Sequence, residues 1–102
     1  MVGRKRKVIW DEIPKQFFKN PIIYIRNSSP QNADKVKSVI LQSIRHLVHE
    51  AEVHPPDKYK ENNEKSQFRA FEKLSLRVSF FVSESEIRIV RIRHVKQAPD
   101  LY

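Results

Sequence analysis

The sequence predicts an α+β domain in which two antiparallel helices pack on one face of a small, mainly antiparallel sheet, in the order β-α-α-β-β-β. Apolar and polar residues alternate in the last third of the chain, and apolar residues recur at helical spacing in the first half. At 102 residues the chain is long enough for one core of two layers. We therefore expect a single domain over 1–102, with a flexible basic N-terminus at 1–6.

The strongest strand signal lies in the 74–82 stretch, where every second residue is apolar. A period of two is typical of a strand with one buried and one exposed face. One parity holds Leu74, Leu76, Val78, Phe80 and Val82, and the other holds Ser75, Arg77, Ser79 and Phe81. We expect the helices to cover the first set. Arg77 should then be exposed, so that replacing it with alanine leaves the fold intact.

A second strand follows the small polar residues of the 83–85 stretch, which predict a turn. Its apolar alternation changes phase at Ile89 and Val90. Such a slip indicates either a β-bulge or a central strand covered on both sides. With a bulge, Arg88, Arg91 and Arg93 come to lie on the same face as Arg77.

The first half of the chain predicts a short edge strand at residues 8–10 and then two helices. Asp11 is a suitable cap for the first helix, which should be interrupted near Asn20 because Pro21 follows. An apolar stripe on it would contain Ile13, Phe17, Tyr24 and Ile25. Ser29 and Pro30 predict the start of the second helix, which should end near His49. Its apolar stripe is Ala33, Val36, Ile40, Ile44, Leu47 and Val48.

The 50–67 stretch is polar and predicts a surface loop. Residues 68–72 predict one more short strand, with Arg69 and Phe71 on one face and Phe68 and Ala70 on the other. Sequential strands at this end of the chain should form an antiparallel meander.

The composition restricts the classes of function. Lys and Arg exceed Asp and Glu by 20 to 12, a net charge of +8 that favours a polyanionic partner. There is no cysteine, which fits a reducing cytoplasm and excludes thiolate chemistry. With a single glycine, phosphate-wrapping glycine loops are excluded. No stretch is apolar enough for a signal peptide or a membrane span, so we expect a soluble cytoplasmic protein without membrane contact.

The candidate site is a cluster of cations with a histidine and a tyrosine. Metal-free RNA cleavage needs a base, cations that stabilise the transition state and an acid for the leaving oxygen. Arg77, His94, Lys96 and Tyr102 are the candidate catalytic residues, with no cofactor. Candidate RNA or phosphate contacts are Arg69, Arg88, Arg91 and Arg93. Composition alone favours binding over catalysis here. We expect no metal site, because His46 and His49 lack a carboxylate at a familiar ligand spacing.

Several segments resemble the RelE/ParE superfamily of bacterial toxins from toxin–antitoxin pairs. They are SPQNADKVKSVI, HPPDKYKENNEKSQFRAFE, LRVSF, EIRIVRIRH and the closing PDLY. The similarity extends from about Lys7 to Tyr102 in the same order of elements. It implies a RelE/ParE-like fold and a small toxin whose basic sheet face is covered by a cognate antitoxin.

The resemblance implies one of two activities. RelE-like members are ribosome-dependent endoribonucleases that cleave mRNA and inhibit translation, whereas ParE-like members bind DNA gyrase without chemistry. Arg77 matches the RelE arginine at the scissile phosphate, Tyr102 the C-terminal tyrosine, and Lys96 the place of an arginine. His94 is similar to the histidine of other ribonuclease members.

The chain departs from the RelE pattern at the paired lysines, because Phe68 and Ala70 occupy their places on either side of Arg69. His94 is then the substitute candidate for the general base. We expect the ribonuclease activity, with gyrase inhibition as the alternative and a generic basic RNA-binding domain as the third possibility.

Overall fold

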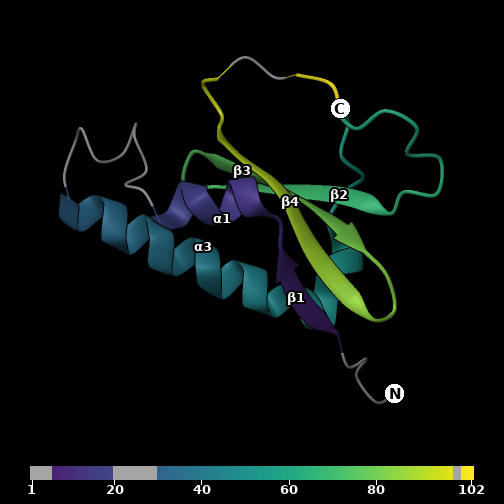
Figure 1. Ribbon diagram of the computed structural model, residues 1–102, viewed down its shortest axis with the longest axis horizontal. Helices are drawn as coiled ribbons and strands as arrows, with labels where there is room; N and C mark the ends of the chain where they lie inside the picture. The colour runs from purple at the N-terminus through teal and green to yellow at the C-terminus, as the bar shows by residue number, and fades with distance from the viewer. Residues whose placement is uncertain (1–5, 20–29, 98–99) are drawn as a thin grey trace.

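Four strands form one sheet, and helices pack against it (Figure 1). The structure is a computed structural model, and it describes residues 6–19, 30–97 and 100–102. The elements in chain order are β1 (Lys7–Trp10), α1 (Glu12–Lys19), α3 (Pro30–Glu50), the short 3-10 helix η1 (Ala51–Val53), β2 (Phe68–Lys73), β3 (Leu76–Val82) and β4 (Glu86–His94).

The sheet is mixed, with strand order β1-β4-β3-β2. β1 pairs parallel to β4, and the other two pairs are antiparallel. The predicted α+β class, the mainly antiparallel sheet and the C-terminal meander are therefore confirmed. β1 lies at one edge, as expected, and β2 lies at the other.

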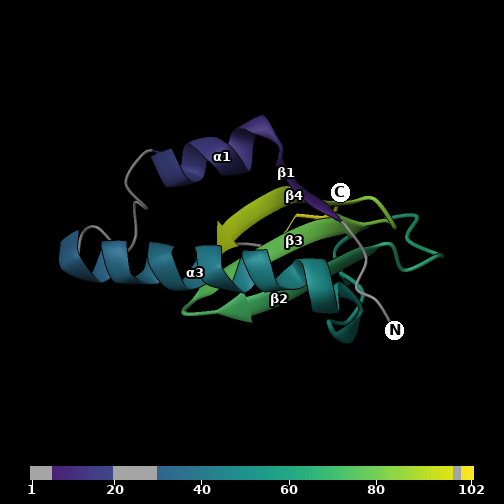
Figure 2. The ribbon, with the colours of Figure 1, turned by 90° about the horizontal axis from the view of Figure 1, so that it is seen from below.

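The core forms between α3 and one face of the sheet (Figure 2). The predicted stripe is confirmed, because Val36, Ile40, Ile44 and Leu47 are buried against Leu76, Val78, Phe80, Ile87 and Ile89. Each such aliphatic side chain contributes roughly 1.5–3 kcal/mol when it is removed from water. Helix α1 runs in the opposite direction to α3 (Figure 1) and contacts β4.

The first helix begins directly after Asp11, as predicted, and the second begins at Pro30. The prediction that Ile13 belongs to the buried stripe is wrong, because Ile13 is 81% exposed. Its neighbour Pro14 is fully buried instead, and successive residues of a helix point about 100° apart. The predicted interruption near Asn20 and the cap at Ser29 lie outside the described residues.

β4 contains the predicted bulge. Ser79 pairs with Arg91, but the next residue, Phe80, pairs with Ile89, so Val90 is an extra residue on β4. Ile87, Ile89 and Ile92 consequently all face the core. The start of β3 was predicted wrongly, because Leu74 lies in the β2–β3 turn rather than in the strand.

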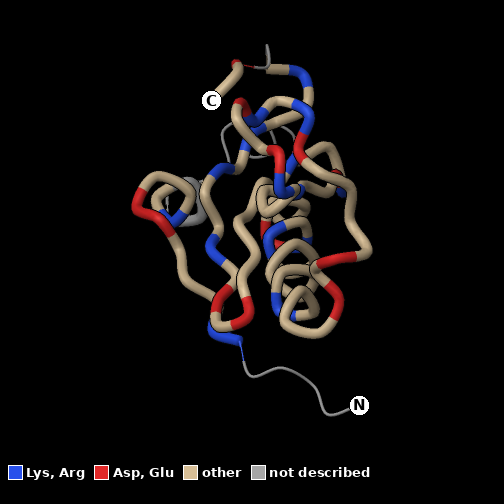
Figure 3. Tube along the Cα trace, turned by 90° about the vertical axis from the view of Figure 1, so that its right-hand side faces the viewer, with Lys and Arg blue, Asp and Glu red and all other residues tan. Residues whose placement is uncertain are grey.

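Arg6 belongs to the N-terminal segment that was expected to be flexible, and residues 1–5 of that segment lie outside the described part. Arg6 is 8% exposed and forms an ion pair with Glu52 of η1. Acidic and basic positions of the backbone trace lie next to each other near the C-terminus and at the opposite end of the molecule (Figure 3).

Within the described ranges, no helix combines the length and the apolar character that a membrane crossing needs.

Candidate functional site

A buried carboxylate lies on the face of the sheet that points away from α3. It belongs to Asp57, whose side chain is 0% exposed. The loop that carries it is attached to the edge strand β2, because the Asp57 amide donates to the Phe68 carbonyl at 2.9 Å. The carboxylate accepts hydrogen bonds from Arg77 at 2.8 Å, from the Tyr59 amide at 3.1 Å and from the Tyr102 hydroxyl.

Arg77 points away from the core, as the alternation predicted, but it is not exposed. Only 10% of its side chain is accessible. Its guanidinium forms ion pairs of 2.8 Å with both Asp57 and Glu72, and its Cζ lies 4.8 Å from the centre of the Tyr59 ring. The expectation of an exposed arginine is therefore wrong, because the loop folds over this face of β3 and supplies a buried partner.

Residues 100–102 form a C-terminal strap across the same face. The Tyr102 amide donates to the Tyr59 carbonyl at 3.0 Å, and the Glu61 amide donates to the Tyr102 carbonyl at 2.6 Å. Arg91 donates to the Asp100 carbonyl at 2.6 Å and stacks on the Tyr102 ring at 4.6 Å. The strap and the loop are thus held together above β3 and β4.

The proton affinities in this cluster follow from burial and pairing. Burial alone would raise the pKa of Asp57, but the hydrogen bonds from Arg77, Tyr102 and the Tyr59 amide lower it below its usual value. Burial opposes the charge of Arg77, yet pairing with Asp57 and Glu72 raises the pKa of the guanidinium. Burial and the bond to Asp57 raise the pKa of the Tyr102 phenol well above its ordinary value. The cluster is a closed ion pair rather than a proton-exchanging site.

His94 and Lys96 lie apart from Arg77. His94 is paired with Leu76 in the sheet register, so it shares the face that carries the core, and it is 7% exposed. Its Nδ1 accepts the Lys96 amide at 3.1 Å. Lys96 itself is exposed beyond the end of β4. Of the four candidate catalytic residues, the structure brings together Arg77 and Tyr102 through Asp57, and it places His94 on the opposite face.

The four candidate phosphate contacts are also divided. Arg88, Arg91 and Arg93 lie on the face of Arg77, which the bulge interpretation predicted. The Arg93 Cζ lies 5.1 Å from the centre of the Tyr59 ring, which also contacts Arg77. Arg88 instead pairs with Asp11 and Glu86. Arg69 lies on the opposite face and donates to the carbonyls of Glu52 and His54, so it does not join them.

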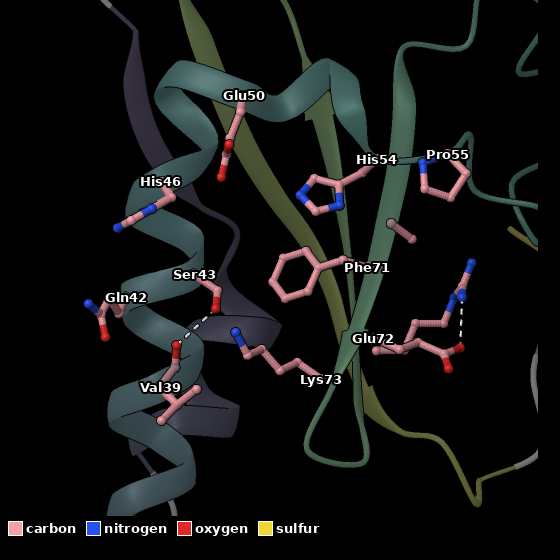
Figure 4. A pocket seen from close by; sticks show the side chains of 12 residues that line it. Val39, Gln42, Ser43, His46, Glu50, His54, Pro55, Phe71, Glu72 and Lys73 are labelled. Atoms are coloured by element: carbon pink, nitrogen blue, oxygen red, sulfur yellow. Dashed lines mark hydrogen bonds and ion pairs between the residues drawn. The ribbon is translucent and has the colours of Figure 1, made fainter.

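A groove of about 850 Å³ lies between α3 and β2 (Figure 4). Ser43 of α3 points toward Phe71 and Lys73 of β2 across it. The Ser43 hydroxyl donates to the Val39 carbonyl, and the His54 ring lies against Phe71 with the ring centres 5.3 Å apart and the planes tilted by 36°. Burial lowers the pKa of His54, which favours a neutral ring. These contacts tie the lining side chains to the fold itself, so the groove supports binding better than chemistry.

Sequence reasoning missed Asp57 and Tyr59, which organise the cluster. Both belong to the polar stretch that predicts a surface loop. The Pro-Pro-Asp-Lys-Tyr pattern does indicate the observed turn, in which Asp57 accepts the Tyr59 amide two residues on. It does not indicate burial. Among the described residues, no group of three or more histidine or acidic side chains is arranged to hold a metal ion.

No model of a known protein family matches the chain, and no curated protein shows significant similarity to it.

Proposed function

We propose that the chain is the toxin of a two-component toxin–antitoxin module and that it acts by binding a protein target, as ParE-like toxins bind DNA gyrase, rather than by cleaving RNA. The resemblance of five segments to the RelE/ParE superfamily supports the toxin class. The α+β order of elements is compatible with a RelE/ParE-like fold. Gyrase inhibition replaces mRNA cleavage as the favoured activity because of the geometry around Arg77.

One observation carries this preference: Arg77 and Tyr102 are both bound to Asp57. A scissile phosphate would need the guanidinium that Asp57 and Glu72 already occupy, and only 10% of the Arg77 side chain is accessible. The Tyr102 phenol holds its proton too tightly to donate it as an acid, because its pKa is raised. His94 lies on the other face of the sheet. Base, cation and acid are thus not assembled at one place, as cleavage requires.

The partners of the proposal follow from the charge. A cognate antitoxin with an acidic toxin-binding segment would cover the sheet face that carries Arg91 and Arg93, since the chain has a net charge of +8. The target and the antitoxin would both be cytoplasmic. A neighbouring reading frame that encodes a short acidic protein with a DNA-binding end would support this module.

The test compares two purified systems. The protein should inhibit gyrase supercoiling of plasmid DNA and leave translation of a reporter mRNA unchanged. Inhibition of translation accompanied by mRNA cleavage would overturn the proposal in favour of the RelE-like activity. Binding of RNA with neither process inhibited would instead favour a generic RNA-binding domain.

Tyr102→Phe separates the two toxin activities further. It removes only the hydroxyl that a cleavage mechanism would use as an acid. We expect the variant to inhibit supercoiling as the wild type does once its folding is verified by circular dichroism. A wild type that cleaves RNA and inhibits translation, together with a folded Tyr102→Phe that does neither, would support the nuclease.

A further inference from the structure

The two-residue β2–β3 turn begins with an exposed leucine whose backbone is left-handed. Leu74 has φ 51° and Ser75 has φ 69°, and Leu74 is 46% exposed. Two-residue hairpin turns of this kind favour Asn-Gly or Asp-Gly. A leucine there costs roughly 1–2 kcal/mol, because its Cβ approaches the following carbonyl. Leu74 is not part of the buried core either. The chain therefore keeps a costly apolar residue where glycine would serve the fold better.

The turn is continuous with the end of β4. The Val95 amide donates to the Ser75 carbonyl at 2.9 Å, which holds the two segments together. Val95 is 37% exposed, and Lys73 and Lys96 are also exposed, with Lys73 at the end of the groove between α3 and β2. We name this set, Lys73, Leu74, Ser75, Val95 and Lys96, the hairpin-tip surface. It lies at the opposite end of the sheet from the β3–β4 turn (Figure 1).

The hairpin-tip surface combines two exposed apolar side chains, Leu74 and Val95, with two exposed lysines. A protein interface buries apolar side chains at its centre and leaves charged groups at its solvent-accessible rim. Within the described residues, no carboxylate forms an ion pair with Lys73 or Lys96. Single-stranded nucleic acid would require aromatic side chains for stacking, and the hairpin-tip surface contains none.

We propose that the hairpin-tip surface is the part of the toxin that contacts its protein target, with Leu74 in an apolar socket and the two lysines facing acidic groups at its rim. This inference rests on the proposed function, since it names the surface through which the inhibitor acts. Backbone strain that persists without a packing benefit is a feature of functional sites. The two lysines would also accelerate association with an acidic target.

The decisive variant is Leu74→Gly, because it removes the apolar side chain and relieves the backbone strain together. We expect an unchanged or higher melting temperature and at least about tenfold weaker inhibition of gyrase supercoiling, the loss typical of a hot spot. Leu74→Asn, which also tolerates positive φ, should behave in the same way. The matched control is Val53→Asn on η1, since Val53 is 72% exposed and lies outside the hairpin-tip surface.

Different outcomes separate the two proposals. If the wild type inhibits supercoiling and Leu74→Gly inhibits it equally, the hairpin-tip inference is overturned and the proposed function stands. If the wild type inhibits translation instead, the proposed function is overturned, and the inference that rests on it is overturned as well. A folded Leu74→Gly that retains inhibition but escapes the antitoxin would assign the surface to the antitoxin and overturn the inference. If the wild type inhibits neither process, both proposals are overturned.

Discussion

Asp57 and Arg77 form a buried pair in which each charge depends on the other. Asp57 is inaccessible, and Arg77 also holds Glu72. Removing one member of such a pair leaves an uncompensated charge in the interior, which typically costs about 3–5 kcal/mol. We therefore expect Arg77→Met to lower the free energy of unfolding by about that amount in urea denaturation at pH 7.

Two further variants test the cause of this loss. Arg88→Met removes an arginine whose ion pairs with Asp11 and Glu86 are at the surface, so its loss should be much smaller. The double variant Asp57→Leu with Arg77→Met removes both charges and should recover part of the stability. If Arg77→Met alone is as stable as the wild type, the buried pair does not stabilise the fold.

The lowered pKa values of His94 and His54 predict that the free energy of unfolding decreases in mild acid. Burial lowers the pKa of each ring, and Lys96 lowers that of His94 further. Below about pH 6.5 the unfolded chain binds protons that the folded chain refuses. The free energy of unfolding should therefore have its full value above pH 7. It should decrease as the pH falls from about 6.5 toward the lower pKa values that the two histidines have in the folded protein.

Urea denaturation at several pH values between 7.5 and 5 would measure this slope. His94→Asn, whose amide oxygen can accept the Lys96 amide, should reduce it. His49→Asn is the control, because His49 is exposed on α3. A free energy that stays constant over this range would contradict the prediction.

At the level of single elements, the sequence predicted most where the pattern is local. The phase slip at Ile89 and Val90 has one physical cause, an extra residue that restores Ile92 to the core face, and the bulge is there. The apolar stripe of α3 was predicted because its apolar residues recur at helical spacing along a helix of 21 residues. Leu74 was assigned to β3 because its parity fits that strand. Its backbone instead adopts a positive φ and forms the β2–β3 turn.

The candidate site was predicted only in part, because its contacts join segments far apart in the chain. The alternation of apolar and polar residues correctly predicted that the Arg77 side chain points away from the core. It could not show that Asp57, 20 residues earlier, would be buried against it. A polar loop composition normally indicates solvent exposure, and tertiary packing overrode this at one carboxylate. His94 was grouped with Arg93 by proximity in sequence, although adjacent strand residues face opposite sides.

For the whole molecule, the sheet is covered on both faces. α3 covers the apolar face, and the 54–67 loop with the C-terminal strap covers part of the arginine face. The arginines were expected to form an open anion receptor. Instead Arg77 is enclosed, whereas Arg91 and Arg93 remain half-exposed beside tyrosine rings. An antitoxin on this face would therefore meet a mixed surface of cations and rings.

We expect Tyr102 to hold the C-terminal strap and the 54–67 loop against the arginine face of the sheet. Its hydroxyl binds Asp57, its ring lies against Arg91, and its carbonyl accepts the Glu61 amide. Tyr102→Ala removes the first two anchors, so the third should open more often. We expect the Glu61 amide to exchange hydrogen at least about tenfold faster, since a hydrogen bond to a charged group contributes about 1.5–3 kcal/mol.

The β1–β4 pairing is remote from the strap and should keep its exchange rates in Tyr102→Ala, as measured by mass spectrometry or NMR. Leu101→Ala is the matched control, because Leu101 is 64% exposed in the same strap. If Tyr102→Ala accelerates exchange at Glu61 and along β1 equally, the strap belongs to the global folding unit. Unchanged exchange at Glu61 would mean that the backbone bonds alone hold the strap. Selective acceleration at Glu61 would make the strap a separate cover that can open while the sheet remains folded.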